Sequence, residues 1–229
     1  GDFYWATQVN EWIVFAVADC TGHGVPGAFM SMLGVSFLNE IVRKKEVTKA
    51  SDVLNQLRQY VVEALQQRAF DRNRVADFTF SDVKDGMDIA VCVYNRNTRM
   101  LQFAGANNPL YIVSVGWPLV SGEVYQQQET SNQQLIELKG DKMPVGIYIR
   151  MNPFTNHEIQ LHPGDTIYLA SDGFEDQFGG PENRKMKSKK LKEILLSGSH
   201  LPMSTQKDLL ETAFTDWKGP GEQLDDVTV

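Results

Sequence analysis

The sequence predicts an α+β fold: a four-layer α-β-β-α sandwich of two mostly antiparallel sheets flanked by helices. Apolar residues recur at helical spacing in two early and two late segments, and short β-like segments lie between them. Several of these strands are joined by tight turns, which suit antiparallel neighbours and leave no room for crossover helices. One strand, 87–94, is apolar on both alternating faces. It therefore needs cover from a second sheet on one side and from helices on the other.

The composition is that of an ordinary globular domain. The 229 residues include 42% hydrophobic residues and a net charge of −7, so a sizeable core is expected and a nucleic-acid-binding surface is not. The longest apolar run, 12–18, is far shorter than the roughly 20 residues that span a bilayer. Two cysteines are too few for a disulfide scaffold and suggest a reducing compartment, so we expect a cytoplasmic segment without membrane contact.

The N-terminal part predicts one buried strand and two helices. The continuous apolar run 12–18 is typical of a strand covered on both faces. A helix is expected over 26–45, since Pro26 suits a first helical position and apolar residues follow at helical spacing. A second helix is expected over 52–68, with Ser51 as its N-cap.

After residue 68 the hydrophobic pattern no longer has only the helical period, and strands are expected as well as helices. The spacing predicts an antiparallel meander of three strands, then an exposed Gln/Ser/Asn-rich loop, two further strands joined by Pro163-Gly164-Asp165, two helices, and a last strand that begins at Asp225. In chain order these segments are 87–94, 100–104, 110–115, 121–134, 157–161, 166–170, 189–196, 205–217 and 225–229. We expect one domain over 1–229 and treat it as the C-terminal part of a longer protein.

Arginine and lysine are concentrated in the segment 184–192, where six of nine residues are basic. Such a run is typical of a solvated helix start. A docking patch for an acidic partner is the alternative.

Two motifs resemble functional sites, but their context does not fit. The residues 22–27 match G-x-G-x-x-G after a strand and before a helix, yet a dinucleotide fold needs a parallel strand after that helix, and here another helix follows. His157 and His162 resemble a zinc H-E-x-x-H motif that is one residue too long. On a strand they would point to opposite faces, so we interpret them as edge or surface histidines. Signals of a cysteine phosphatase loop, a P-loop or a serine elbow are absent from the sequence.

Four aspartates lie at strand ends: Asp2, Asp19, Asp172 and Asp225. Each alone would be an ordinary turn former. Together, without a matching set of Arg or Lys partners, they form a set of hard oxygen donors that suits Mg²⁺ or Mn²⁺ better than Zn²⁺. A shared carboxylate can hold two such ions ~4 Å apart with an activated water between them, so no protein nucleophile is needed.

Seven motifs in order carry a family resemblance. They are Gly-Asp-Phe-Tyr (1–4), Ala-Asp-Cys-Thr-Gly-His-Gly-Val-Pro-Gly-Ala (18–28), Asp-Gly-Met-Asp-Ile-Ala (85–90), Ala-Gly-Ala-Asn-Asn-Pro-Leu-Tyr (104–111), Met-Pro-Val-Gly (143–146), Ala-Ser-Asp-Gly-Phe-Glu-Asp-Gln-Phe-Gly-Gly (170–180) and Asp-Asp-Val-Thr (225–228). Over essentially its whole length, the chain resembles the SpoIIE-type branch of the PPM family, the metal-dependent serine/threonine phosphatases.

The resemblance implies an activity and a setting. It implies an α-β-β-α sandwich with two Mn²⁺ or Mg²⁺ ions, and hydrolysis of phosphoserine or phosphothreonine on a protein by metal-activated water. In many relatives that protein is a phosphorylated anti-sigma-factor antagonist, and the phosphatase follows an upstream sensor domain. A homodimer and membrane tethering through a preceding segment remain open.

The resemblance also implies roles for individual residues. Asp19 would bridge both metals, and the carbonyl of Cys20 would bind one of them. Asp172 and Asp225 would complete the other site, and Asp2 would act as a ligand directly or through water. Asp225 is preferred over the following Asp226 because the family motif places the ligand first.

Two further residues have alternative readings. His23 would serve in acid catalysis or phosphate contact, or would only shape its loop. Asp88 has a structural or a metal-binding role.

Two rival interpretations remain. One is a catalytically silent interaction module of the same fold, which the retained aspartates argue against. The other is a nucleotide-binding α/β domain, which rests on the glycine run 22–27 alone.

Overall fold

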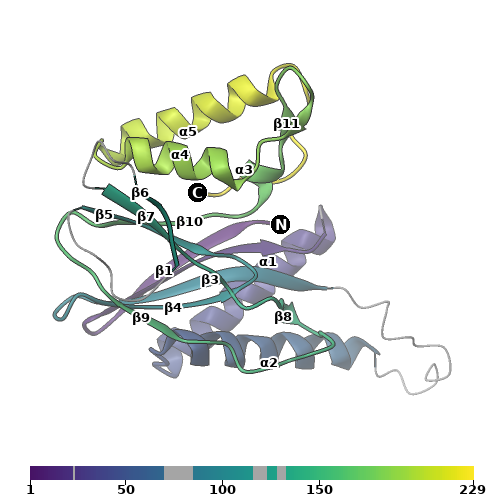
Figure 1. Ribbon diagram of the computed structural model, residues 1–229. Coiled ribbons are helices and arrows are strands. Elements are labelled where there is room, and N and C mark those ends of the chain that lie inside the picture. Colours follow the sequence, from purple (N-terminus) through teal and green to yellow (C-terminus); the bar gives the residue numbers. More distant parts are fainter. Residues whose placement is uncertain (23, 70–84, 116–122, 128–132) are drawn as a thin grey trace. The chain divides into compact units, whose positions relative to one another are not determined.

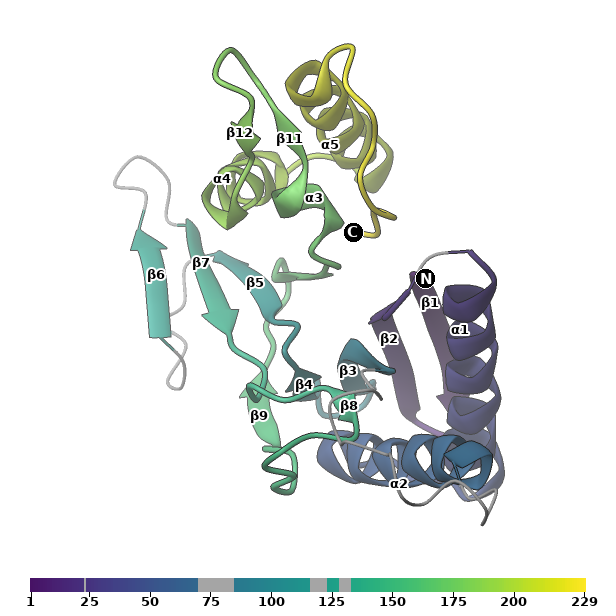
Figure 2. The same cartoon turned by 90° about the vertical axis from the view of Figure 1, so that its right-hand side faces the viewer.

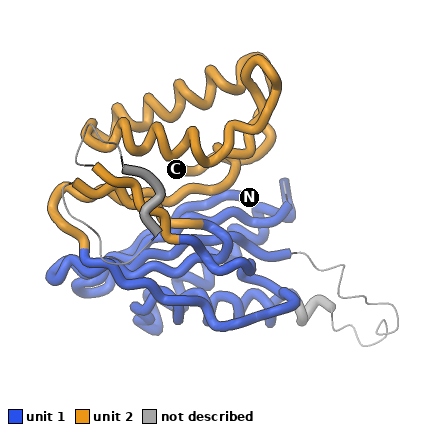
Figure 3. The backbone as a smooth tube through the Cα atoms, in the orientation of Figure 1, with its two compact units in different colours: residues 1–108, 139–160 blue, residues 109–138, 161–229 orange. Residues whose placement is uncertain are grey.

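A computed structural model describes residues 1–22, 24–69, 85–115, 123–127 and 133–229. The chain forms two compact units, coloured separately in Figure 3. Unit 1 comprises residues 1–108 and 139–160, and unit 2 comprises residues 109–138 and 161–229.

A six-stranded antiparallel sheet forms the centre of unit 1. Its order is β1-β2-β3-β4-β9, and the short β8 pairs with β3 beside that path. The strands are β1 (Phe3–Val9), β2 (Trp12–Cys20), β3 (Gly86–Asn95), β4 (Met100–Ala106), β8 (Val145–Gly146) and β9 (His157–Gln160). The predicted strands 12–18 and 87–94 are confirmed as β2 and β3, and most side chains of β3 are buried on both faces.

Two long helices pack against this sheet (Figure 1). Helix α1 (Val25–Leu38) continues as a π-helix, η1 (Asn39–Lys44), and α2 (Ala50–Ala69) follows. The fully buried Leu38, Ile41 and Leu57 join the apolar face of the sheet in one hydrophobic core. By length and composition, Val25–Lys44 is the one described helical stretch that passes as a candidate membrane span, although its buried residues belong to this core.

The predicted N-cap of α2 is wrong by two residues. Ser51 lies inside the helix, because the carbonyl of Lys49 already accepts hydrogen bonds from the N–H groups of Asp52 and Val53. The Ser51 N–H donates instead to Oδ1 of Asn156, 3.1 Å away. The amide oxygen of a residue distant in the sequence thus satisfies one of the first-turn N–H groups that have no partner within the helix.

Unit 2 contains a four-stranded antiparallel sheet of order β10-β5-β7-β6. Its strands are β5 (Leu110–Val115), β6 (Glu123–Gln127), β7 (Gln133–Leu138) and β10 (Thr166–Leu169). Figure 2 shows the helices that follow: α3 (Gly173–Asp176), α4 (Ser188–Gly198) and α5 (Met203–Lys218), with the hairpin β11 (Phe178–Gly179) and β12 (Arg184–Lys185) between α3 and α4. Tyr111, Phe174, Leu191 and Leu195 form its core.

The predicted three-stranded meander is wrong at its third strand. β3 and β4 pair as expected, but β5 pairs with β7 and β10 in the other sheet. The chain leaves the first sheet at Asn107, which has a positive φ of 58°, and at Pro109, which has no N–H for a ladder. Strand-like periodicity predicted β5 correctly but carried no information about its partner.

Two further expectations need correction. Residues 123–127 and 133–134, expected in an exposed loop, belong to β6 and β7, while the rest of 121–134 lies outside the described residues. Residues 225–229 form no strand. Instead, the Ser171 N–H donates to the Thr228 carbonyl and the Thr228 N–H donates to Oγ of Ser171. One of these two bonds uses a side chain, so no backbone ladder extends through the tail.

The remaining predicted elements agree with the structure. The two late helices are α4 and α5, and the predicted edge position of His157 is confirmed, because β9 ends its sheet and the His157 ring lies against Phe103. Antiparallel sheets with flanking helices confirm the predicted α+β class.

Candidate metal centre

In unit 1, Asp19 lies at the end of β2. The buried run of β2 fixes the register, which places Asp19 opposite Asp88 and Cys20 opposite Met87 on β3. Thr21 then ties the strand end to β3: its N–H donates to the Gly86 carbonyl, and its Oγ1 accepts from the Gly86 N–H at 3.0 Å. The position of Asp19 is therefore fixed by the pairing of β2 with β3 before it and by the two Thr21–Gly86 hydrogen bonds after it.

Asp2 lies at the same end of this sheet. It precedes Phe3, which pairs with Ala18, so Asp2 is one residue beyond the ladder beside Asp19. Asp88 completes a row of three carboxylates, with Asp19 on β2, Asp88 on β3 and Asp2 just before β1. Like charges on adjacent strands repel one another, and a divalent cation would relieve this repulsion.

Asp88 is held by the two asparagines that follow β4. Nδ2 of Asn107 donates to Oδ1 of Asp88 at 2.8 Å, and Nδ2 of Asn108 donates to the Asp88 carbonyl at 3.1 Å. These bonds favour the structural reading of Asp88. Both asparagines belong to the 104–111 motif, so the sequence singled out these residues. Their hydrogen bonds to Asp88 could be recognised only once the pairing of β3 with β4 was known.

The thiol of Cys20 is buried at the end of β2. Burial, together with the nearby Asp19, raises its pKa to about 11, although a hydrogen bond from Ser31 opposes the shift. A protonated thiol is a poor ligand, because the thiolate is the form that binds metals. The predicted contribution of Cys20 through its carbonyl oxygen is compatible with this chemistry.

In unit 2, Asp172 and Asp225 lie close together although they are 53 positions apart in the sequence. Each has a carboxylate oxygen within 4.8 Å of the other's, and both side chains are exposed. Asp172 follows β10 and precedes α3, and its carbonyl accepts the N–H of Asp176. The structure thus brings together two of the predicted ligands.

The contact between Ser171–Gly173 and the C-terminal tail brings this pair together. Besides the two Ser171–Thr228 bonds, a Cβ atom on Gly173 would lie only 2.0 Å from the carbonyl oxygen of Asp226. Only glycine permits so close an approach of the two backbones. The glycine of the Asp-Gly dipeptide in the 170–180 motif is therefore explained by packing, because a larger residue would clash with the tail.

Glu175, one turn after Asp172, adds negative charge to unit 2. Burial raises its pKa, and Asp176 and Asp172 raise it further, while Lys192 opposes the shift. Lys192 also forms an ion pair with Glu137, with Nζ and Oε2 2.9 Å apart and little of either side chain exposed. Sequence reasoning missed Glu175 and this pair, because their partners lie on β7 and α4.

The glycine-rich turn 22–27 serves the start of α1. Gly22 and Gly24 have positive φ of 92° and 66°, and the Gly24 carbonyl accepts the N–H of Ala28. A Cβ on Gly27 would lie 2.3 Å from the Gly22 carbonyl oxygen. The next strand, β3, runs antiparallel to β2, so the parallel strand that a dinucleotide fold requires does not follow. His23 lies outside the described residues.

The donor set fits hard divalent cations. The strand ends of unit 1 and the loop–tail contact of unit 2 offer carboxylate oxygens and a carbonyl, and neither thiolate nor imidazole contributes among the described residues. Mg²⁺ and Mn²⁺ prefer such oxygens.

Comparison with known structures identifies the class. The SiaA PP2C domain of Pseudomonas aeruginosa matches with a TM-score of 0.77 and 27% identity, covering 99% of this chain and 77% of that one. The PP2C phosphatase domain and regulatory fragment of SpoIIE from Bacillus subtilis match at 0.67 and 16%, covering 99% and 56%. The RsbU and RsbW domains of a Mycobacterium tuberculosis protein match at 0.66 and 16%, covering 99% and 52%. No curated protein matched in a sequence search.

The fold and these similarities define a PPM-type phosphatase domain of the SpoIIE, RsbU and SiaA type. A family model described as Stage II sporulation protein E (SpoIIE) matches residues 10–229, and the chain belongs to this family. A further matched structure, with a TM-score of 0.55 and 13% identity, is that of RsbX in complex with magnesium. The chain spans little more than half of the second and third matched structures.

Proposed function

We propose that this domain hydrolyses phosphoserine or phosphothreonine on a regulatory protein with two bound Mn²⁺ or Mg²⁺ ions. The pairing of Asp172 with Asp225 in unit 2 is the observation that carries the proposal, because the two residues are far apart in the sequence and their carboxylate oxygens nevertheless lie within 4.8 Å of each other. Family membership over residues 10–229 supports the reaction class.

In this proposal Asp19 would be a ligand shared by the two ions, the Cys20 carbonyl would hold one of them, and Asp172 and Asp225 would hold the other. Asp2 contributes directly or through a water. When bound, the ions supply an acidified water and neutralise charge on the phosphoryl oxygens. The protein positions the ligands. The hydrogen bonds between Thr21 and Gly86 hold Asp19 at the end of β2, and the hydrogen bond from Asn107 holds Asp88. His23 would serve in acid catalysis or phosphate contact, or would only shape its loop.

The substrate and setting are also part of the proposal. A phosphorylated anti-sigma-factor antagonist is the proposed substrate, since SpoIIE and RsbU are among the similar structures. We further propose that residues 1–229 form a single domain, that a sensor domain precedes it, and that it acts in the cytoplasm. Membrane tethering would then come from a preceding segment of a longer protein, and the weak candidate span Val25–Lys44 would remain core helix.

The test is phosphate release from a generic aryl phosphate and from a phosphoserine protein during a Mn²⁺ titration. We expect hydrolysis that depends strictly on added metal, and a loss of at least ~100-fold in turnover for Asp19→Ala, because the bridging ligand is removed. Asp52→Asn is the matched control, since Asp52 is an exposed carboxylate on α2 of the same unit. Wild-type turnover in Asp19→Ala would falsify the mechanism, and absence of hydrolysis at any Mn²⁺ concentration would favour the silent module.

A further inference from the structure

Gln177 of unit 2 is a buried polar residue that the phosphatase proposal does not use. It follows α3 directly and is only 1% exposed. Both N–H groups of its side-chain amide are used, because Nε2 donates to the carbonyls of Phe178 and Glu222, each at 2.9 Å. Its Oε1 accepts the N–H of Leu224 at 3.2 Å. A primary amide carries donors and an acceptor on one planar head, so an apolar side chain of the same length would leave these backbone groups unpaired.

Two of these contacts hold the tail directly before Asp225. The Gln177 amide binds the carbonyl of Glu222 and the N–H of Leu224, one on each side of Gln223, and Asp225 comes next. Gln223 also donates from its own Nε2 to the carbonyl of Asp225 at 2.8 Å. Residues 222–225 are all exposed, so apolar packing contributes little to their position. The position of this part of the tail therefore depends on hydrogen bonds, and its buried partner is Gln177.

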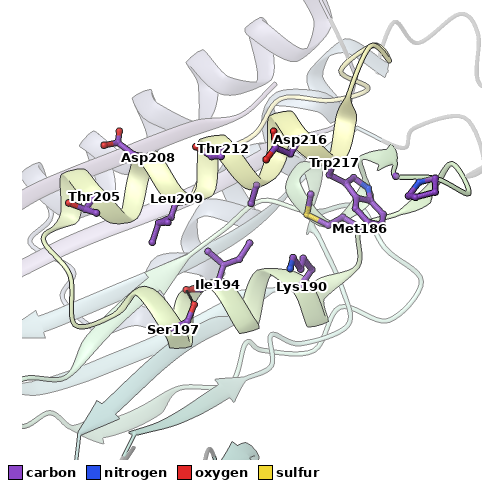
Figure 4. A pocket seen from close by; sticks show the side chains of 13 residues that line it. Met186, Lys190, Ile194, Ser197, Thr205, Asp208, Leu209, Thr212, Asp216 and Trp217 are labelled. Atoms are coloured by element: carbon purple, nitrogen blue, oxygen red, sulfur yellow. Dashed lines mark hydrogen bonds between the residues drawn. The ribbon is translucent and has the colours of Figure 1, made fainter.

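The backbone of Gln177 is held in turn by two other parts of unit 2. Its carbonyl accepts the indole N–H of Trp217 at 3.1 Å and the backbone N–H of Met186 at 3.0 Å. Trp217 lies near the end of α5 and Met186 lies just before α4, and both line the pocket of about 610 Å³ between these helices (Figure 4). The Gly180 N–H donates to the Trp217 carbonyl, and a Cβ on Gly179 would lie 1.9 Å from that oxygen. Gln177 is therefore fixed against the end of α5.

The segment 172–177 connects the two predicted ligands of unit 2. Asp172 begins it, and the Asp172 carbonyl accepts the N–H of Asp176 at 2.9 Å across the single turn of α3. Gln177 ends it and holds the tail before Asp225. The segment thus carries one predicted ligand at its start and, at its end, the amide that fixes the chain next to the other ligand.

We propose that Gln177 is a positioning residue for the metal centre, and that its side-chain amide places Asp225 against Asp172. This role rests on the proposed function, because it requires Asp225 to be a metal ligand. A residue that only stabilises the fold affects the free energy of unfolding. A residue that positions a ligand also affects the affinity for the metal.

The test compares two variants that each remove one buried amide from unit 2. Gln177→Met keeps the length of the side chain and the backbone bonds of this residue, and removes the bonds to the tail. Gln206→Met is the matched control, since Gln206 is 6% exposed, accepts from the Tyr168 hydroxyl at 2.7 Å and donates to the Leu201 carbonyl at 2.8 Å. Both variants should melt at a lower temperature than wild type. In isothermal titration of the folded proteins, Gln177→Met should bind Mn²⁺ at least ~10-fold more weakly, because two bonds to the tail are lost, and Gln206→Met should bind it like wild type.

Each other outcome of the titration contradicts the positioning role. Equal Mn²⁺ affinity in wild type and Gln177→Met overturns this role and leaves the proposed metal centre intact. An equal loss of affinity in Gln177→Met and Gln206→Met would show that lower stability is the cause, and would overturn it as well. If wild type binds no Mn²⁺, the proposed function fails, and the positioning role fails with it.

Amide hydrogen exchange of the wild-type protein without metal tests the contact itself. Leu224 is 61% exposed and lies outside helices and strands, yet its N–H is bonded to a buried oxygen. In the part of the chain that the structure describes, the backbone N–H of the neighbouring Gln223 has no partner. After correction for intrinsic rates, we expect the Leu224 N–H to exchange at least ~10-fold more slowly than the Gln223 N–H. Equal exchange would show that Gln177 does not hold the tail, and would overturn the inference whether or not the protein binds metal.

Discussion

The two units present their acidic groups in different ways. In unit 1, Asp2, Asp19 and Asp88 lie on or next to neighbouring strands of a paired sheet with a core on one side. In unit 2, Asp172 precedes a four-residue helix and Asp225 lies in a tail without a strand, and they meet through a close loop–tail contact. The first arrangement is built into the sheet, whereas the second depends on a few hydrogen bonds and one glycine.

This difference predicts that mutations near the two groups of carboxylates weaken metal binding by different routes. Carboxylates on a sheet keep their positions as long as the sheet is folded, so mutations of the residues that support them, rather than of the carboxylates themselves, should act through global stability. Carboxylates brought together by a tail can separate while the rest of the unit stays folded, so mutations there should act on metal affinity first. The predictions below test this separation, beginning with the largest effect.

The largest effect is expected in the core of unit 1. Leu57 is fully buried on α2 within that core, and Leu57→Ala leaves a cavity that should cost about 2–5 kcal/mol in the free energy of unfolding. Urea denaturation followed by circular dichroism measures the loss. Leu209→Ala, at a position 40% exposed, is the comparison and should cost under ~1 kcal/mol. Equal losses for the two variants would contradict the assignment of Leu57 to the core.

The next largest effect is expected at the loop–tail contact of unit 2. Gly173→Ala would place a methyl group 2.0 Å from the carbonyl oxygen of Asp226, so the tail must move and carry Asp225 away from Asp172. We expect Mn²⁺ affinity to fall at least ~10-fold, about 1.4 kcal/mol, with little change in far-ultraviolet circular dichroism. Isothermal titration with Mn²⁺ measures it. Gly198→Ala is the control, because the added methyl group would meet only ordinary contacts. Unchanged Mn²⁺ affinity in Gly173→Ala would show that the tail holds no ligand.

A direct comparison of the two units uses one hydrogen bond from each. Ser171→Ala removes the bond from the Thr228 N–H, and Asn107→Ala removes the 2.8 Å bond to Asp88. Each bond is worth ~1 kcal/mol. In Ser171→Ala this loss should weaken Mn²⁺ binding about fivefold, because the tail depends on it. In Asn107→Ala we expect a lower unfolding free energy and nearly unchanged Mn²⁺ affinity, because β3 still holds Asp88. The reverse pattern would refute the distinction between sheet-held and tail-held groups.

The same distinction explains how much of the protein its sequence predicted. Hydrophobic periodicity located β2, β3, α1 and α2, because each buries a face whose period is fixed by backbone geometry. It failed where the outcome depended on distant partners. β5 was assigned to a meander but pairs with β7 and β10, and Ser51 lost its capping role to a contact with Asn156. Periodicity contains no information about either partner.

The candidate site was likewise predictable only in part from the sequence. Asp172 and Asp225 could be paired by family resemblance, and the structure brings them within 4.8 Å of each other. The hydrogen bond to Ser171 and the close backbone approach at Gly173 were not predicted, because the tail was expected to be a strand. A strand would have been held by backbone bonds alone, whereas this tail uses a side chain and a missing Cβ atom. No alternation pattern encodes such a contact.

The smallest expected effect concerns the pH dependence of unit 2 without metal. Burial, with Asp176 and Asp172 nearby, raises the pKa of Glu175 in the folded state above its usual 4.5. As pH rises through that usual value, the unfolded chain releases the Glu175 proton first, so folding loses stability until the folded-state pKa is passed. Glu175→Gln removes this loss. In the presence of a chelator, the variant should therefore melt at a higher temperature than wild type at pH 7, and the gap should close below pH ~4, where both states of wild type are protonated. Glu158→Gln, an exposed change on β9, should leave the melting temperature unchanged at both pH values. A variant that melts at a lower temperature than wild type at pH 7 would mean that Glu175 is stabilised as a carboxylate in the folded state, and that Lys192 outweighs its burial.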